Sequence, residues 1–218
     1  MHKILKLGAV LFIITAVTGL ILGAVHTVTL EPIREAQARE KNDALKATMP
    51  GAQEFKEVKL TGDAGIIKEI YEGTANGKTV GYDFTVTPKG YGGPLKIIVG
   101  VGNDGRVKDL RILTSSETPG LGAKAAQEPF AGQFREKVAK VLTVTKTPPT
   151  ADTEIQAISG ATITSLAVTR GVNTAIEYWQ KNFSEDKAAA TTAPEAKEAP
   201  AAPEKPDAVS SASEKEED

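Results

Sequence analysis

The chain has 218 residues, of which 40% are hydrophobic and 25% are charged, and its formal net charge at pH 7 is −2. This near balance predicts no nucleic-acid partner, because nucleic-acid-binding domains carry a marked basic excess. There is no cysteine, and the histidines are His2 and His26. Disulfides, iron–sulfur clusters and covalent haem are therefore excluded, and no metal site is expected in the soluble part. Electron transfer by this protein would need an organic cofactor.

A long apolar stretch lies near the N-terminus. Residues 7–28 read LGAVLFIITAVTGLILGAVHTV and contain no acidic or basic residue except His26. As a helix this stretch can cross a hydrocarbon core of about 30 Å, so we expect a single transmembrane anchor over residues 1–29, in contact with membrane lipid. No A-x-A site lies near residues 23–24, which favours an uncleaved anchor over the alternative, a cleaved signal peptide.

The charges that flank this stretch do not decide its orientation. Lys3 and Lys6 on one side are balanced by Arg34, Arg39 and Lys41 on the other, all within the range where positive residues bias topology. A short N-terminal segment before a large domain is compatible with export of that domain, because long segments translocate largely regardless of charge. We expect a cytoplasmic N-terminus and an extracytoplasmic domain.

Three further segments follow the anchor. Residues 30–51 are mostly good helix formers after Pro32, which suits the first turn of a helix, and they predict a juxtamembrane stalk. Residues 52–185 alternate strand-like runs with turn residues and predict one α+β domain. Residues 186–218 are rich in Ala, Pro, Glu and Lys and contain no aromatic residue, which predicts a disordered tail.

Within the domain, residues 79–87 and 95–101 read as strands. Apolar residues at the spacing of one helix face predict a helix; they are Phe130, Phe134, Val138 and Val141. Residues 100–105 match the dinucleotide-binding pattern G-x-G-x-x-G, but the following residues 106–113 read as a strand and not as the helix that this pattern must open. Because Asn-Asp-Gly is strong turn chemistry, we predict a β-hairpin at residues 100–105.

Two loops contain several glycines. Residues 89–94 read KGYGGP and place Tyr91 where its ring can face a ligand, although a flexible connection explains the segment nearly as well. Residues 116–122 read SETPGLG, and the Pro119-Gly120 pair suits the centre of a type II turn. The two loops would gain functional meaning if they met at one end of the sheet.

Residues 159–165 read SGATITS and precede an amphipathic helix, for which Ser165 is the predicted N-cap. The apolar stripe of that helix consists of Val168, Val172, Ile176, Trp179 and Phe183. A helix start offers unpaired N–H groups and a positive dipole end, small side chains let a phosphate approach, and a threonine hydroxyl can be esterified by it. The segment predicts a phosphate site, with a plain loop and cap as the alternative.

These residues resemble a known family, the FMN-binding subunits of membrane respiratory complexes, and most closely the G subunits of Rnf ion-translocating oxidoreductases. The resemblance covers the anchor, residues 31–33, 89–93 and 117–122, and above all the Ser-Gly-Ala-Thr motif at 159–162. It implies that a dedicated flavin transferase joins FMN through its phosphate to the threonine that closes the motif, which is Thr162 here.

The expected cofactor site extends beyond Thr162. Thr164 carries a second hydroxyl two residues on and stays open as an alternative attachment residue. We also expect Glu117 and Thr118 to contact the flavin ring or its ribityl chain. The other residues expected at the site are Ser159, Gly160, Ala161, Ser165 and Tyr91. The family usually has Asp three residues before the Ser of the motif, whereas this chain has Gln156, which keeps a hydrogen-bonding side chain without the charge.

The resemblance implies a relay protein in electron transfer between ferredoxin and NAD, coupled to translocation of Na+ or H+, with the domain on the non-cytoplasmic face and the other subunits of the complex as partners. Such a relay catalyses no complete reaction alone. A bound flavin also agrees with the lack of cysteine. The alternatives are the C-type FMN subunit of a Na+-translocating NADH:quinone reductase, a non-redox membrane-anchored scaffold, and a reductase with non-covalent FMN.

Overall fold

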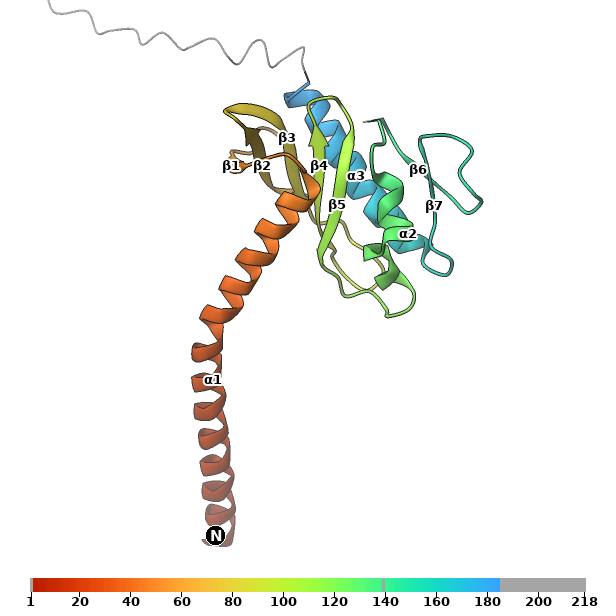
Figure 1. Ribbon diagram of the computed structural model, residues 1–218. Helices are drawn as coiled ribbons and strands as arrows, with labels where there is room; N and C mark the ends of the chain where they lie inside the picture. Colours follow the sequence, from red (N-terminus) through yellow and green to blue (C-terminus); the bar gives the residue numbers. More distant parts are fainter. Residues whose placement is uncertain (1, 139, 185–218) are drawn as a thin grey trace, which may run out of the picture.

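The computed structural model describes residues 2–138 and 140–184. A long N-terminal helix leads into a domain built around a five-stranded sheet (Figure 1). Antiparallel strands and separate helices confirm the predicted α+β class and the apolar N-terminal helix. The predicted tail, residues 186–218, lies outside the described residues.

The first element, α1 (His2–Thr48), is one continuous helix that is long and apolar enough to cross a membrane. Pro32 lies inside it, whereas the sequence predicted the first turn of a separate helix at this residue. The apolar stretch is itself helical and continues without a break into the helix formers that follow. An internal proline removes one backbone hydrogen bond and bends a helix, and Figure 1 shows α1 changing direction along its length. The expected anchor and stalk are parts of one helix.

The sheet is an antiparallel meander whose strands lie in chain order. Its strands are β1 (Glu54–Val58), β2 (Ile67–Ala75), β3 (Lys78–Val86), β4 (Lys96–Gly102) and β5 (Val107–Thr114). The strands predicted at 79–87 and 95–101 are β3 and β4. The predicted hairpin joins β4 to β5, where the Gly102 N–H donates to the Arg106 carbonyl at 2.8 Å and Gly105 has φ 69°. The G-x-G-x-x-G segment is thus a turn and opens no helix.

The two faces of the sheet pack against different helices. The predicted amphipathic helix, α3 (Thr162–Asn182), buries Val168, Val172 and Ile176 against one face, in the main core with residues such as Phe84 and Val99. The end of α1 covers the other face, where Ala44 and Leu45 form a small cluster with Ile98. Each fully buried side chain of this size contributes about 1.5–3 kcal/mol. The large cluster therefore holds the domain together, and the small one attaches α1.

The segment between β5 and α3 departs from the prediction of a helix through Phe130 and Val141. It contains three short helices, η1 (Gly122–Ala126), α2 (Glu128–Ala131) and η2 (Gly132–Phe134), and later a small parallel pair, β6 (Thr143–Thr145) and β7 (Glu154–Gln156). After η2 the chain turns at Glu136, whose φ is 59°, and pairs with the edge of the sheet. The Glu136 N–H donates to the Val107 carbonyl at 2.7 Å. Edge pairing satisfies the backbone groups that a helix would otherwise satisfy.

Candidate functional site

Three segments that are distant in sequence meet at the N-terminal end of α3. They are the loop between β3 and β4, the loop after β5, and the SGAT segment. Between them lies a cavity of about 440 Å³, a size typical of small-molecule sites. The lining residues are Tyr91, Glu117, Thr118, Leu121, Gly122, Gly160, Ala161, Thr162, Ile163 and Thr164. The two glycine-containing loops therefore do meet the SGAT segment.

The start of α3 differs from the prediction. The helix begins at Thr162 with Ala161 as its N-cap, and no side chain caps it. Ser165, the predicted cap, is buried inside the first turn, where its hydroxyl donates to the Ala161 carbonyl at 3.0 Å and accepts from the Ile158 N–H at 3.0 Å. The chain turns already at Gly160, with φ 77°, which lets the helix begin before Ser165. The first N–H groups of α3 have no partner within the helix.

The two candidate attachment hydroxyls have different surroundings. Thr162 is partly exposed, and its hydroxyl makes no hydrogen bond to any described residue. Thr164 is only 1% exposed, and its hydroxyl donates to Oε2 of Glu117 at 2.8 Å. Because the segment is helical and not extended, the two side chains point about 200° apart around the axis. The hydroxyl that remains available is that of Thr162.

The carboxylate of Glu117 connects all three segments. Glu117 is 7% exposed, and its Oε1 accepts from the Gly92 N–H at 3.1 Å while its Oε2 accepts from Thr164. A Cβ atom on Gly90 or Gly122 would collide with this carboxylate. Gly90 and Gly122 are therefore required by the close approach of Glu117, which organises the cavity wall. The expected contact of Glu117 with a flavin stays a prediction.

Exposed apolar side chains stand around the cavity. Tyr91 is 73% exposed, Ile163 is 55% exposed, and Leu121 is also exposed. Leu121 is the last residue of the predicted turn. Its N–H donates to the Thr118 carbonyl at 3.1 Å, and Gly120 has φ 79°, as in a type II turn. Side chains of this kind at a cavity mouth suit a flat aromatic ligand.

Most of the expected site residues lie together, and two do not. The expected residues that line the cavity are Tyr91, Glu117, Thr118, Gly160, Ala161, Thr162 and Thr164. Ser165 is buried within α3, and Ser159 lines a neighbouring cavity of about 370 Å³ together with Gln156. The sequence reasoning missed Leu121, Gly122 and Ile163 as lining residues. The sequence did indicate them indirectly, because Leu121 and Gly122 lie in residues 116–122 and Ile163 lies in residues 159–165, the segments from which other site residues were predicted.

The groups that line the cavity suit both the phosphate and the ring of FMN. A phosphate at the start of α3 would meet the N–H groups of the first helical turn and the positive end of the helix dipole. The Thr162 hydroxyl makes no bond to a described residue, and the apolar rim of Tyr91, Leu121 and Ile163 suits an isoalloxazine ring. The comparisons with known proteins point to the same cofactor.

Residues 90–177 match the family model of the FMN-binding domain, so the fold and the cavity define an FMN-binding protein. The G subunit of the proton-translocating ferredoxin:NAD+ oxidoreductase complex of Clostridium ljungdahlii is 39% identical over 161 residues, covering 74% of this chain and 83% of the relative. The G subunit of the Na+-translocating complex of Acetobacterium woodii is 38% identical over 191 residues, covering 81% and 92%. The chain belongs to this family of G subunits, the FMN-binding subunits of Rnf-type complexes.

A solved structure also resembles the fold. The C subunit of the Na+-translocating NADH-quinone reductase from Parabacteroides distasonis superimposes with a TM-score of 0.52 at 19% identity, covering 67% of this chain and 94% of that chain. At this identity the likeness concerns the fold alone.

Proposed function

We propose that this chain is the membrane-anchored, FMN-carrying electron-transfer subunit of an Rnf-type complex, which couples electron transfer between ferredoxin and NAD+ to translocation of H+ or Na+. Membership of the family of G subunits and the match to the FMN-binding domain support this function. The apolar helix α1 supports membrane anchoring. The other subunits of the complex are then the electron donor and acceptor, and this chain performs no complete reaction alone.

FMN is attached through its phosphate to Thr162. The observation that carries this assignment is the contrast between two neighbouring hydroxyls: that of Thr162 has no described partner, whereas that of Thr164 is buried and bonded to Glu117. Attachment forms one ester bond between Oγ1 of Thr162 and phosphorus, and the elements of one water molecule leave. A flavin transferase performs this step during maturation.

The chain's own residues then position the cofactor. The N–H groups at the start of α3 hold the phosphate, and the Glu117 carboxylate fixes the two loops against Thr164. Tyr91, Leu121 and Ile163 shield the ring from water. Bound FMN supplies the electron-carrying chemistry that the side chains of this cysteine-free chain lack.

The domain lies on the extracytoplasmic side, with the N-terminus in the cytoplasm. In Figure 1 the loop after β5 and the start of α3 lie at the end of the domain nearer the N-terminal half of α1. With the N-terminal part of α1 in the membrane, we expect this end of the domain to face the bilayer, where it can exchange electrons with membrane-embedded subunits.

The test is the intact mass of the full chain, purified after coexpression with a flavin transferase, beside the variants Thr162→Ala, Thr162→Ser and Thr164→Ala. We expect the mass of FMN less one water to be added to the wild type and to Thr164→Ala and to be absent from Thr162→Ala. Thr162→Ser keeps a hydroxyl and retains the mass gain if the hydroxyl alone is needed. Loss of the gain only in Thr164→Ala would transfer the attachment to Thr164.

The shared fold of the C subunit is consistent with one alternative function, the C-type subunit of a Na+-translocating NADH:quinone reductase. The two functions are separated by the subunits that copurify with the full chain from its native membrane. A colourless protein without the mass gain would instead support a scaffold without redox chemistry, and release of flavin on denaturation would indicate a non-covalent FMN reductase.

A further inference from the structure

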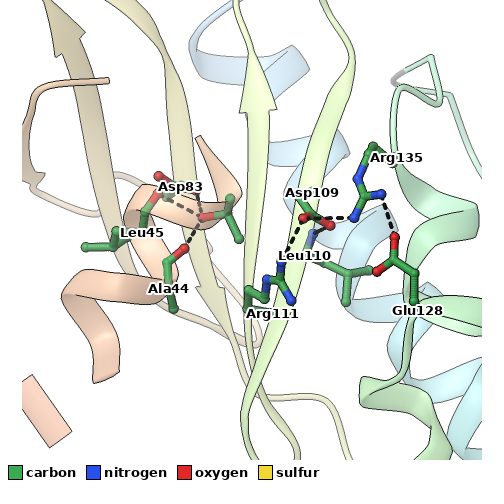
Figure 2. A network of polar contacts seen from close by, with 9 residues as sticks. Ala44, Leu45, Asp83, Asp109, Leu110, Arg111, Glu128 and Arg135 are labelled. Carbon is green, nitrogen blue, oxygen red and sulfur yellow. Dashed lines mark hydrogen bonds and ion pairs between the residues drawn. The ribbon is translucent and has the colours of Figure 1, made fainter. Parts of the chain in front are cut away.

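The end of α1 is attached to the sheet above a buried carboxyl group. Asp83 of β3 is 0% exposed and lies beside Ala44 and Leu45 in the last turns of α1 (Figure 2). Its Oδ1 is 2.7 Å from Oγ1 of Thr48, and its buried Oδ2 has no hydrogen-bond partner among the described residues. Gly100 faces Asp83 on β4, where a Cβ atom would collide with the Thr48 carbonyl. The glycine allows the helix end to come this close.

The hydroxyl of Thr48 has one hydrogen for three nearby acceptors. Oγ1 is 2.9 Å from the Ala44 carbonyl, 3.2 Å from the Leu45 carbonyl and 2.7 Å from Asp83. If Asp83 is ionised, it takes this hydrogen and still leaves Oδ2 buried without a donor. If Asp83 is protonated, it donates to Oγ1 of Thr48, and Thr48 donates to the Ala44 carbonyl. The protonated form therefore completes a chain of hydrogen bonds that the ionised form leaves incomplete.

No cation among the described residues is paired with Asp83. The charged and titratable groups that share this face of the sheet with Asp83 are Glu57, Glu69, Tyr71, Lys96, Asp109 and Arg111, and those in the adjoining turns of α1 are Glu40, Lys41, Asp43 and Lys46. Lys41 is ion-paired with Glu69 at 2.8 Å, and Asp109 with Arg111 at 3.4 Å. Figure 2 shows the Asp109 network as a separate group beyond β4. Burial raises the pKa of Asp83 to about 7, and the Thr48 hydrogen bond acts in the opposite direction.

We propose that Asp83 is a proton-binding site that links protonation to the attachment of α1 to the domain. With the proton bound, the helix end rests on a neutral, fully bonded group. Loss of the proton leaves an uncompensated charge beneath α1, which costs free energy unless the helix moves away and water enters. The inference rests on Asp83, Thr48 and Gly100 and is independent of FMN.

The direction of the pH effect follows from the raised pKa of Asp83. Its ordinary value is 3.8, and the attached state raises it to about 7. The attached state therefore binds more protons than the detached state between these values. The contribution of the bound proton on Asp83 to the stability of the attached state is fully present below about pH 4, falls as the pH rises, and is lost above about pH 7.

The absence of cysteine allows a direct measurement of this attachment. Ala38→Cys on α1 and Lys78→Cys on β3 place two spin labels at exposed positions of the full chain in lipid nanodiscs. Pulsed electron spin resonance then gives the distance distribution between them. We expect a single narrow distribution near pH 4 that broadens progressively towards about pH 7 and changes no further above it.

Two variants test the assignment to Asp83. Asp83→Asn cannot ionise, so its distribution should not change with pH. Thr48→Val removes the hydrogen-bond partner that Asp83 has in both its protonated and its ionised form, so the pH range over which the distribution broadens should shift. A wild-type distribution that is constant from about pH 4 to pH 9 would overturn the proposal, as would an unaltered pH dependence in Asp83→Asn. If Asp83→Asn does not fold, Thr48→Val provides the test. If the distance distribution of Thr48→Val broadens over the same pH range as that of the wild type, Asp83 is excluded as the titrating group.

Discussion

Oγ1 of Thr164 donates a hydrogen bond of 2.8 Å to Oε2 of Glu117, across 47 residues of sequence. The second oxygen of the same carboxylate accepts from the Gly92 N–H, so one buried side chain holds the first turn of α3 and both loops of the cavity. The bond has two consequences. It removes Thr164 from the set of available hydroxyls, and it makes the shape of the cavity depend on Glu117.

Glu117→Ala should destabilise the domain by about 1–3 kcal/mol, because it leaves the Gly92 N–H and the Thr164 hydroxyl without their acceptor in a buried place. Glu117→Gln should cost less than about 1 kcal/mol, since its amide oxygen can face Gly92 while the Thr164 hydroxyl rotates to accept from the amide. Urea unfolding measures both, with the exposed Thr118→Ala as control. Equal stability of Glu117→Ala and the wild type would contradict this role.

Gly122→Ala should deform the cavity wall. A Cβ atom at Gly122 would lie 2.7 Å from Oγ1 of Thr164 and even closer to the Glu117 carboxylate, so both must move. Overpacking of this kind costs about 1–3 kcal/mol. FMN content after coexpression with the transferase should fall together with the urea midpoint. Gly132→Ala is the matched control, because the atoms nearest to its Cβ belong to the flexible Glu128 side chain. A similar loss in Gly132→Ala would argue against a local cause.

The proposed orientation, with a cytoplasmic N-terminus and an extracytoplasmic domain, predicts that the two ends of the chain differ in their accessibility to reagents outside the cell. In a chain without other cysteines, Lys56→Cys on exposed β1 should react with a membrane-impermeant maleimide in spheroplasts, whereas Lys3→Cys should react only after lysis. Gel shift after labelling with a maleimide polymer measures both. The reverse pattern would place the domain in the cytoplasm and remove the support for an extracytoplasmic flavin.

Glu136→Gly should stabilise the protein slightly. Glu136 is exposed with φ 59°, a left-handed conformation that costs a side-chain-bearing residue about 1–2 kcal/mol. The greater freedom of glycine in the unfolded chain offsets about 0.5–1 kcal/mol of this gain. Asn76, with φ 51°, is the comparison, because asparagine tolerates this conformation and Asn76→Gly should gain less. A fall in the thermal midpoint of Glu136→Gly would show that its 3.2 Å ion pair with Lys108 outweighs the strain.

Predictions from local patterns succeeded where the pattern lies within one element. The apolar stripe of α3 is buried at Val168, Val172 and Ile176, and the turn chemistry of residues 100–105 gives the β4–β5 hairpin. The helix expected through Val138 and Val141 is absent, since the described chain beyond η2 pairs with the edge of the sheet. The predicted cap Ser165 is buried within α3, because the turn at Gly160 starts the helix sooner.

The sequence by itself determined the apolar helix, the α+β class, the lack of thiol chemistry and the SGAT motif, because these depend on composition and on spacing within short segments. Only the tertiary structure decided that the hydroxyl of Thr162, and not that of Thr164, is available, and that Asp83 is buried beneath α1. Both depend on contacts between residues far apart in sequence. Thr164 meets Glu117, and Thr48 meets Asp83, only when the folded sheet and helices bring them together. The free-energy cost of burying a polar group then determines whether the Thr164 hydroxyl is available and whether Asp83 holds a proton. This cost depends on burial, which a local sequence pattern does not give.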